Sequence, residues 1–282
     1  MSSGSSRRGF LRDIGLAAAR QVANRFEDEP EVAESRLTED EVQRYARQLA
    51  LPEWSETAQV ALRDASVLVV GLGGLGAPVA MHLAGAGVGR LGIVDGDAVE
   101  ISNLHRQHLH FTPDLGVAKP ASAAAKLRFL NPEIMVEDYY VSIDAENAAG
   151  MVETNDLVVD CSDSFATRYA VNAACCAAGI PLVEGGVTGW HGLVMPIRPR
   201  QTACYRCAFP VPPADAPSCA EAGVLGPAAG VIGSLQALEA LKLLTGAVAP
   251  LTDGFLQVDL ASLDVLRVSV ARRDDCPDCG GV

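Results

Sequence analysis

Short apolar segments alternate with amphipathic segments through most of the chain. The apolar run Ser66–Val70 predicts a buried strand, Leu75–Ala86 predicts a helix, and Arg90–Asp95 predicts a second strand, which together form a βαβ unit of about thirty residues. The pattern continues with a helix over Lys119–Leu130, a strand near Ile134–Val141, a strand over Asp156–Asp160, a helix over Phe165–Ala178 and a strand over Ile180–Val187. This alternation predicts a Rossmann-like, doubly wound parallel sheet.

The pattern changes in the last third of the chain. Leu193–Ile197 and Phe255–Val270 alternate polar and apolar residues as antiparallel strands do, and the latter contains a turn at Ala261-Ser262. A long amphipathic helix is predicted between them, over Ala228–Leu244. The predicted fold class is therefore α/β, with a Rossmann-like mixed sheet that ends in an antiparallel portion.

The first 36 residues differ from the rest and are predicted to be an appendage and linker, which leaves residues 37–282 as one domain. A stretch near the start resembles a twin-arginine export signal, but charged residues interrupt its apolar character, so a basic amphipathic helix is favoured. An acidic linker follows. Thr38 and Glu41 have the spacing of a capping box, at the start of a helix predicted to end at Leu49.

Composition narrows the classes of function. The chain has 282 residues, of which 49% are hydrophobic and 20% charged, and its formal net charge is −13. Proteins that wrap nucleic acid need basic patches, which this balance disfavours. No apolar run approaches the ~20 residues of a membrane span. We therefore expect neither a nucleic-acid partner nor membrane insertion.

A glycine-rich turn follows the first predicted strand. Gly71, Gly73 and Gly76 fit the spacing GxGxxG, with Gly74 between them, and Asp95 ends the second strand about 20 residues later. The glycines allow backbone N–H groups to approach a phosphate, and the acid stands where a ribose hydroxyl binds. The motif predicts a nucleotide site but leaves NAD, FAD and ATP open. Because the chain has no GxxxxGK followed by Ser or Thr, it is not a P-loop protein.

Polar and charged residues follow the second strand: Asp97, Asn103, Arg106, Gln107 and Lys119. An enzyme that transfers an adenylyl group must bind a triphosphate and neutralise the pyrophosphate that leaves, which fixed cations and Mg²⁺ do. A dehydrogenase does not need several cations beside its phosphates. Taken alone, Arg106 or Lys119 could equally be an ordinary surface cation. The cluster as a whole favours ATP chemistry.

A second acid, Asp163, follows the predicted central strand Asp156–Asp160. Open α/β sheets bind ligands beyond the carboxyl ends of their strands, so this carboxylate is placed to hold Mg²⁺ against phosphates. Asp163 or Ser164 is also suited to cap the helix that begins at Phe165. The metal role and the capping role can coexist.

Four of the eight cysteines form two CxxC pairs, Cys204 with Cys207 and Cys276 with Cys279. Four thiolates match a closed, tetrahedral, structural zinc site. Two redox pairs or an iron–sulfur cluster are the alternatives. Metal binding together with single thiols favours a reducing, cytoplasmic compartment.

Cys219 lies in the segment 210–227, which is rich in Pro, Ala and Gly and predicts a long exposed loop. A thiol there is able to take an acyl group from an adenylate or to exchange disulfides with a sulfur donor. The alternative is a spare cysteine, because adenylation itself needs no thiol. Cys161, Cys175 and Cys176 are predicted to be buried in the core.

From Leu37 to Cys279 the chain resembles the MoeB/ThiF-type adenylyltransferases, which activate ubiquitin-like sulfur carriers for molybdopterin and thiamine synthesis and are related to ubiquitin-activating enzymes. The resemblance rests on Arg44-Tyr45-Ala46-Arg47-Gln48, Gly71–Gly76, Asp95-Gly96-Asp97, Ser102-Asn103-Leu104-His105-Arg106-Gln107, Lys119, Asp160-Cys161-Ser162-Asp163 and both CxxC pairs. The chain departs from the family pattern at Ser164, where Asn is usual, and at Pro120. Neither departure removes a charged group, but the first puts in doubt one polar contact at the carrier's tail.

The resemblance implies a role for each of these residues. It places Asp95 on the ribose of ATP and Asp163 near Mg²⁺ and the reacting carboxylate. It places Arg47 in the ATP site of a second subunit, which implies a homodimer, and Cys219 in a crossover loop. It implies zinc at the four paired cysteines. The residues it places around the phosphates are Asn103, Arg106, Gln107 and Lys119.

The expected function is ATP-dependent adenylation of the C-terminal glycine of a ubiquitin-like sulfur carrier that ends in Gly-Gly, with release of pyrophosphate. Sulfur would come from an external donor or sulfurtransferase. One alternative, based on the glycine turn alone, is an NAD- or FAD-dependent Rossmann oxidoreductase. Another is a non-catalytic module of the same fold that binds peptide tails. The sequence does not identify the carrier or the pathway.

Overall fold

The computed structural model describes residues 36–211 and 223–280 of the chain. The chain divides into two compact units, Met1–Glu56 and Thr57–Val282. Apart from Arg36, the predicted appendage lies outside the described residues, and so does Cys219. The predicted start of the domain at residue 37 stays a prediction.

The described part of the first unit contains the helices α2 (Glu39–Arg44) and α3 (Ala46–Leu49). The Glu41 N–H donates to Thr38 Oγ1 at 3.2 Å and the Thr38 N–H donates to Glu41 Oε2 at 2.7 Å, so the predicted capping box is confirmed. The prediction of one continuous helix is wrong. Tyr45, with φ −98° and ψ 12°, leaves helical geometry and separates α2 from α3.

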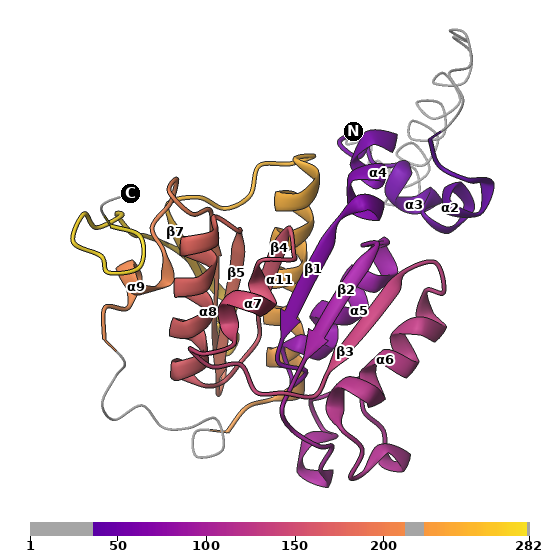
Figure 1. Ribbon diagram of the computed structural model, residues 1–282, viewed down its shortest axis with the longest axis horizontal. Coiled ribbons are helices and arrows are strands. Elements are labelled where there is room, and N and C mark those ends of the chain that lie inside the picture. The colour runs from indigo at the N-terminus through magenta and orange to yellow at the C-terminus, as the bar shows by residue number, and fades with distance from the viewer. Residues whose placement is uncertain (1–35, 212–222, 281–282) are drawn as a thin grey trace, which may run out of the picture. The chain divides into compact units, whose positions relative to one another are not determined.

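An eight-stranded sheet forms the centre of the second unit (Figure 1), with the strand order β3-β2-β1-β4-β5-β6-β7-β8. The first five strands are parallel and the last three are added antiparallel. The strands are β1 (Ser66–Val70), β2 (Arg90–Val94), β3 (Met135–Tyr139), β4 (Leu157–Asp160), β5 (Leu182–Thr188), β6 (His191–Ile197), β7 (Gly254–Asp259) and β8 (Asp264–Ser269). The predicted fold class, a Rossmann-like mixed sheet with an antiparallel end, is confirmed.

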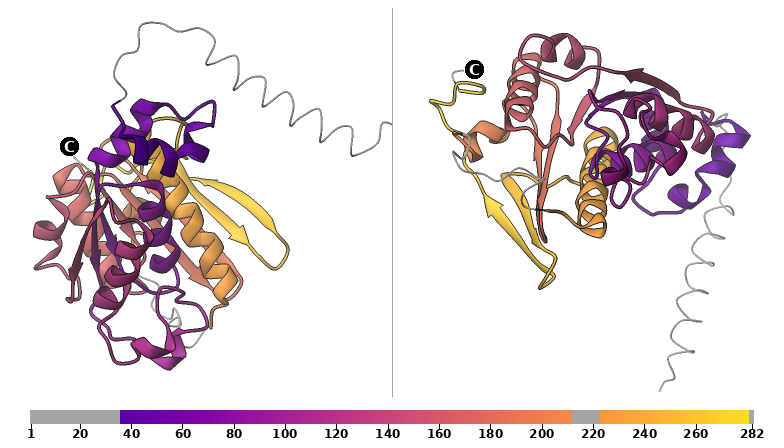
Figure 2. Two further views of the ribbon diagram at one scale, coloured as in Figure 1. Left: turned by 90° about the vertical axis from the view of Figure 1, so that its right-hand side faces the viewer. Right: turned by 90° about the horizontal axis from the view of Figure 1, so that it is seen from below.

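Helices cover both faces of this sheet (Figures 1 and 2). Helices α5, α6 and α11 pack on one face and α7 and α8 on the other. The bounds are α4 (Glu56–Asp64), α5 (Gly76–Ala86), α6 (Lys119–Leu130), α7 (Ala148–Val152), α8 (Phe165–Ala178), α9 (Tyr205–Ala208) and α11 (Gly226–Thr245), with 3-10 turns η1 (Ile101–Asn103) and η2 (Thr112–Asp114). Helix α8 ends at Gly179, which has a left-handed backbone, as the sequence predicts.

Strands β1 and β4 run through the core. Residues Val67–Val70 and Leu157–Asp160 are at most 3% exposed, which requires the apolar runs seen in the sequence because both faces of these strands are covered. Helix α11 is long and apolar enough to cross a membrane by length and composition. In the structure it packs on β4, β5, β6 and α5, which is the place of a core helix.

Candidate functional site

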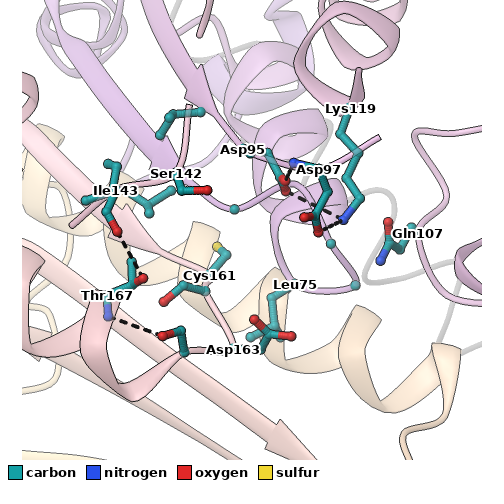
Figure 3. A pocket seen from close by; sticks show the side chains of 18 of the residues that line it. Leu75, Asp95, Asp97, Gln107, Lys119, Ser142, Ile143, Cys161, Asp163 and Thr167 are labelled. Carbon is teal, nitrogen blue, oxygen red and sulfur yellow. Dashed lines mark hydrogen bonds and ion pairs between the residues drawn. The ribbon is translucent and has the colours of Figure 1, made fainter. Parts of the chain in front are cut away.

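A pocket opens at the carboxyl ends of β1, β2 and β4 (Figure 3). Strands β2 and β3 lie on one side of β1, and β4 and β5 lie on the other, so the direction of winding changes beside β1. Open α/β sheets bind ligands at such a switch point. The sequence-predicted residues that line the pocket are Gly71, Gly73, Gly74, Asp95, Asp97, Arg106, Gln107, Lys119 and Asp163.

The glycines of the turn lack side chains for different reasons. Gly71 has φ +85°, and a Cβ there would stand 3.0 Å from the Cys161 carbonyl oxygen. A Cβ on Gly76 would stand 1.8 Å from the Gly71 carbonyl oxygen, so the turn could not close. A Cβ on Gly73 would meet Gln107 Nε2 at 3.6 Å and no other described atom within 4 Å. Packing within the protein explains Gly71 and Gly76, whereas the space over Gly73 is open to a ligand.

Two acids and a lysine meet beside the turn (Figure 3). Lys119 Nζ lies 2.7 Å from Asp97 Oδ2 and 3.9 Å from Asp95 Oδ2. Asp95 also accepts hydrogen bonds from the Leu72 N–H at 2.7 Å and from the Asp97 N–H at 2.8 Å. Burial raises the pKa of Asp95, and the charge of Lys119 opposes the rise. The ammonium is buried and its closest partner, Asp97, is exposed, so an incoming phosphate can compete for it.

Arg106 and Gln107 contribute further polar groups to the pocket. Arg106 Nη1 donates to the Ser102 carbonyl oxygen at 2.8 Å, which orients the guanidinium. Gln107 is 4% exposed, and its Oε1 has no hydrogen-bond partner among the described residues. A buried polar atom without a partner costs free energy, so this amide is suited to a bound ligand or water.

The side chain of Asn103, by contrast, forms a hydrogen bond with the nearby backbone. Its Oδ1 accepts from the Glu100 N–H at 3.1 Å at the start of η1. The described residues that line the pocket do not include it. Its implied position beside the phosphates stays a prediction.

The acid Asp163 stands in the loop between β4 and α8 and lines the pocket. Ser164, not Asp163, caps the helix: Ser164 Oγ accepts from the Thr167 N–H at 3.4 Å. Of the two capping candidates in the sequence, the structure selects the serine. The exposed Asp163 carboxylate is thereby left for a cation or substrate in the pocket.

A buried charge cluster holds the loop that carries Asp163. Asp160 Oδ1 accepts from the Ser162 N–H at 2.8 Å, and Arg168 Nη2 donates to the Ser162 carbonyl oxygen at 2.7 Å. Ser162 is therefore held on both sides of its α-carbon, directly before Asp163. Arg168 also lines the pocket, so the cluster extends from the core to the site.

The third member of the cluster is Glu184, the neighbour of Asp160 across β4 and β5. Both carboxyl groups are 0% exposed, and Arg168 Nη1 lies 3.2 Å from Glu184 Oε1. Burial raises the pKa of both groups; the charge of Asp160 adds to the rise at Glu184, and Arg168 opposes it. One guanidinium cannot balance two buried carboxylates, so this pair of acids takes up a proton more readily than two exposed carboxylates do.

The four paired cysteines form one cluster beside α8, where Asn172 contacts both cysteine turns. All four are buried, and their sulfur atoms lie within 4.8 Å of one another, with 3.6 Å between Cys204 and Cys276 and 3.4 Å between Cys207 and Cys279. Zinc–thiolate bonds of about 2.3 Å in a tetrahedron place the sulfur atoms about 3.8 Å apart. The cluster thus fits one zinc ion, and its convergence disfavours two separate redox pairs.

A model of the ThiF family matches residues 45–278. The chain belongs to the ThiF family. The sulfur carrier protein adenylyltransferase of Thermus thermophilus is 46% identical to this ThiF-family chain over 252 residues, which make up 87% of the chain and 93% of the relative. The adenylyltransferase and sulfurtransferase MOCS3 of Xenopus laevis is 44% identical over 253 residues, which make up 89% of the chain and 56% of MOCS3. The chain therefore spans about half of MOCS3.

Solved structures share the ThiF-family architecture. The crystal structure of E. coli MccB with MccA-N7isoASN has a TM-score of 0.78 and 22% identity, and it covers 99% of this chain and 84% of that one. E. coli MccB with ATP has a TM-score of 0.75 and 22% identity, with 98% and 83% covered. At this identity the likeness establishes the fold.

Sequence reasoning missed three residues that shape the site of this ThiF-family chain. Arg168 is the one charged residue of α8, and Glu184 is an acid inside a buried strand, so each was visible as an exception to its pattern. His110, which contacts the glycine turn, had no such signal. Of the other predicted site residues, Arg47 belongs to the first unit, and Cys219 lies outside the described residues.

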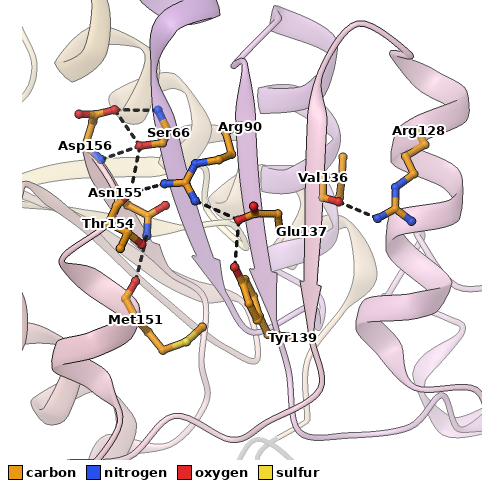
Figure 4. Close-up of polar contacts among 10 residues, drawn as sticks. All are labelled: Ser66, Arg90, Arg128, Val136, Glu137, Tyr139, Met151, Thr154, Asn155 and Asp156. Carbon is orange, nitrogen blue, oxygen red and sulfur yellow. Dashed lines mark hydrogen bonds and ion pairs between the residues drawn. The ribbon is translucent and has the colours of Figure 1, made fainter.

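Polar side chains at the opposite end of the sheet bind one another (Figure 4). Asp156 Oδ2 accepts from the Ser66 N–H and from Ser66 Oγ, both at 2.8 Å. Arg90 Nη1 lies 2.9 Å from Glu137 Oε2. These contacts join the amino ends of neighbouring strands and have a structural role.

Proposed function

We propose that the chain uses ATP to adenylate the C-terminal carboxylate of a ubiquitin-like sulfur carrier and releases pyrophosphate. The observation that carries the proposal is the pocket, in which an open glycine position at Gly73, an acid at Asp95 and the cations Arg106 and Lys119 surround one space. Membership of the ThiF family and 46% identity to a sulfur carrier protein adenylyltransferase support it.

In the proposed reaction an oxygen of the carrier carboxylate forms a bond to the α-phosphorus of ATP. The bond from that phosphorus to the bridging oxygen breaks, and pyrophosphate leaves with the electron pair. The carboxylate is already ionised near neutral pH, so the reaction needs no general base. Catalysis consists of alignment and of neutralising charge that grows on the leaving group.

The polar residues of the pocket divide this work among them. Asp95 would accept a ribose hydroxyl, since its oxygens retain lone pairs beyond the two backbone N–H groups they already bind. Arg106 and Lys119 would bind the phosphates, and Gln107 would add a polar contact. Lys119 would exchange the exposed Asp97 for a phosphate oxygen.

Asp163 would hold Mg²⁺, which prefers one or two carboxylates together with phosphate oxygens. The residue fits this role because its carboxylate is exposed in the pocket and does not cap α8. When bound, the metal supplies positive charge to the phosphates. The Ser162 peptide, held by Asp160 and Arg168, fixes the loop on which Asp163 stands.

Several parts of the proposal concern partners. We infer a homodimer, in which Arg47 of one copy completes the pocket of the other, and a carrier that ends in Gly-Gly. Sulfur would arrive from an external donor or sulfurtransferase, and Cys219 would be a thiol available for acyl or sulfur transfer. None of the seven described cysteines forms a disulfide, which supports a reducing, cytoplasmic setting.

The direct test is to detect the acyl-adenylate. The chain is incubated with ATP, Mg²⁺ and a sulfur carrier, and the carrier is analysed by mass spectrometry for added AMP. The matched control is the same carrier without its last glycine. We expect AMP on the intact carrier alone. ATP binding without AMP transfer to any intact carrier would instead support a peptide-binding module, and binding of NAD or FAD in place of ATP would support an oxidoreductase.

A further inference from the structure

The backbone of Leu72, inside the glycine turn, is held on both sides. Its N–H donates to Asp95 Oδ2 at 2.7 Å, and its carbonyl oxygen lies 3.1 Å from His110 Nε2. Leu72 is 0% exposed and His110 is 2% exposed, so water does not compete for either bond. The residues that line the pocket include Asp95 but, among those described, not His110.

The partners of His110 determine which ring nitrogen carries the proton. A carbonyl oxygen accepts hydrogen bonds and never donates, so Nε2 must be the protonated nitrogen. His110 Nδ1 lies 2.9 Å from Ser122 Oγ and accepts from that hydroxyl when the ring is neutral. Lys126 Nζ in turn donates to Ser122 Oγ at 2.8 Å. The chain of hydrogen bonds from Lys126 to Leu72 therefore runs in one direction.

The surroundings keep the His110 ring neutral. The charged groups that face it are Lys119 and Lys126 on α6 and Asp114 in η2. Burial lowers the pKa of His110, both lysines lower it further, and the bond to Leu72 and the charge of Asp114 oppose them. A neutral ring keeps its Nε2–H directed at Leu72 across the neutral pH range.

We propose that His110 is a positioning residue for the phosphates of the nucleotide, because it fixes the peptide that joins Leu72 to Gly73. The proposal rests on the proposed ATP site. This peptide is trans, so its C=O and N–H point in opposite directions. When the Leu72 carbonyl points to the buried His110, the Gly73 N–H points to the other side, where Gly73 lines the pocket. Without His110 the peptide is free to turn its carbonyl oxygen toward the phosphates, which would repel them.

Two substitutions separate this role from simple core packing. In His110→Gln the side-chain amide nitrogen takes the place of Nε2 and can still donate to Leu72. In His110→Asn the shorter side chain ends near the place of Nδ1, so it retains the contact with Ser122 and loses that with Leu72. His108→Asn is the control, because His108 stands two residues away on the surface.

The test measures ATP binding by calorimetry and the unfolding temperature for the full chain and all three variants. We expect His110→Gln and His108→Asn to bind within about twofold of the unchanged chain, and His110→Asn to bind about tenfold more weakly, the cost of one lost hydrogen bond. Equal affinity of His110→Asn and the unchanged chain would overturn the proposal. The proposal would also be overturned if His110→Gln and His110→Asn lost ATP affinity equally and both losses ran in parallel with a lower unfolding temperature. An unchanged chain that binds no ATP would contradict the proposed function itself.

A second measurement does not depend on ATP. Nitrogen-15 NMR of the histidine rings in the unchanged chain should show His110 as the neutral Nε2–H tautomer at pH 8, with a pKa below the ordinary value for histidine. A neutral ring that carries its proton on Nδ1 would overturn the hydrogen-bond arrangement even if ATP binding is confirmed, and so would a His110 pKa above the ordinary value for histidine.

Discussion

At the scale of single residues, a substitution at Gly73 distinguishes an effect on ligand binding from an effect on folding. Gly73→Ala should leave the unfolding temperature almost unchanged, because the new Cβ meets Gln107 Nε2 at 3.6 Å and nothing closer. It should weaken ATP binding at least about tenfold, because the methyl group occupies space that the phosphates approach. Calorimetry of both variants and the unchanged chain checks this.

The control for this experiment is Gly85→Ala. Gly85 lies in α5, and a Cβ there meets nothing within 4 Å. Alanine should raise the free energy of unfolding by about 0.5–1 kcal/mol and leave ATP binding unchanged. Equal ATP affinity of Gly73→Ala and Gly85→Ala would contradict the assignment of the open space to a nucleotide.

Glu184 should make the free energy of unfolding depend on pH. Its pKa is raised in the folded chain, so between its ordinary value of about 4.3 and the raised value the folded state binds more protons than the unfolded state. The free energy of unfolding therefore falls as pH rises, by up to about 1.4 kcal/mol per pH unit for one proton. Glu184→Gln should flatten this slope in urea titrations from pH 5 to pH 8. Glu133→Gln, on the surface, should keep it.

Site residues that belong to a sequence motif could be predicted from the sequence, whereas site residues outside any motif could not. The glycine spacing, the acids at strand ends and the CxxC pairs mark chemistry directly, and the structure gathers most of them in one pocket and one cysteine cluster. Asn103 lies three residues before the pocket residue Arg106, yet its side chain caps a turn. The role of His110 depends on a contact with Leu72, 38 residues away, which periodicity does not reveal.

At the scale of elements, prediction succeeded where burial determines the pattern. Strand β1 and helices α6 and α8 have the predicted bounds. A continuous apolar run marks β1, the turn signal Asn131-Pro132 ends α6, and a glycine C-cap ends α8. The short helices α4, α7 and α9 were not predicted. Tertiary packing, such as that of α7 and α9 against α8, stabilises helices of this length more than intrinsic propensity does.

Helix α8 also joins the two cysteine turns. Asn172 Nδ2 donates to Asp278 Oδ2 at 2.7 Å, and Asn172 Oδ1 accepts from the Tyr205 N–H at 2.9 Å. Each turn is thus bonded to the same buried side chain. A metal at the four cysteines would complete this connection between segments that are far apart in the sequence.

Removal of the metal should therefore loosen these turns. The purified chain should contain about one zinc per copy, and a strong chelator should lower its unfolding temperature. Elemental analysis of Cys276→Ser should show loss of zinc. The control Cys175→Ala removes a buried thiol of α8 that does not belong to the cluster, and should keep the metal. Full zinc content in Cys276→Ser would contradict the four-cysteine site.

At the scale of the whole molecule, the proposed homodimer predicts complementation. Arg47→Ala and Lys119→Ala should each be inactive, because each removes a cation from every site. When the two variants are mixed and allowed to exchange subunits, one of the two sites in a mixed dimer regains both cations. Activity should approach about a quarter of that of the unchanged enzyme, from random pairing of subunits. Continued inactivity of mixtures that form mixed dimers would contradict a shared site.

The central claim is that the pocket adenylates a carboxyl terminus, and the exchange of labelled pyrophosphate into ATP tests it most directly. With Mg²⁺ and a carrier that ends in Gly-Gly, label should enter ATP. It should not do so without the carrier, and Lys119→Ala should slow the exchange by at least about 100-fold, the effect of losing one group that stabilises transition-state charge. Exchange at the same rate with a carrier that lacks its terminal Gly-Gly would contradict the account. So would the absence of exchange with any carrier that ends in Gly-Gly, if the chain binds NAD or FAD.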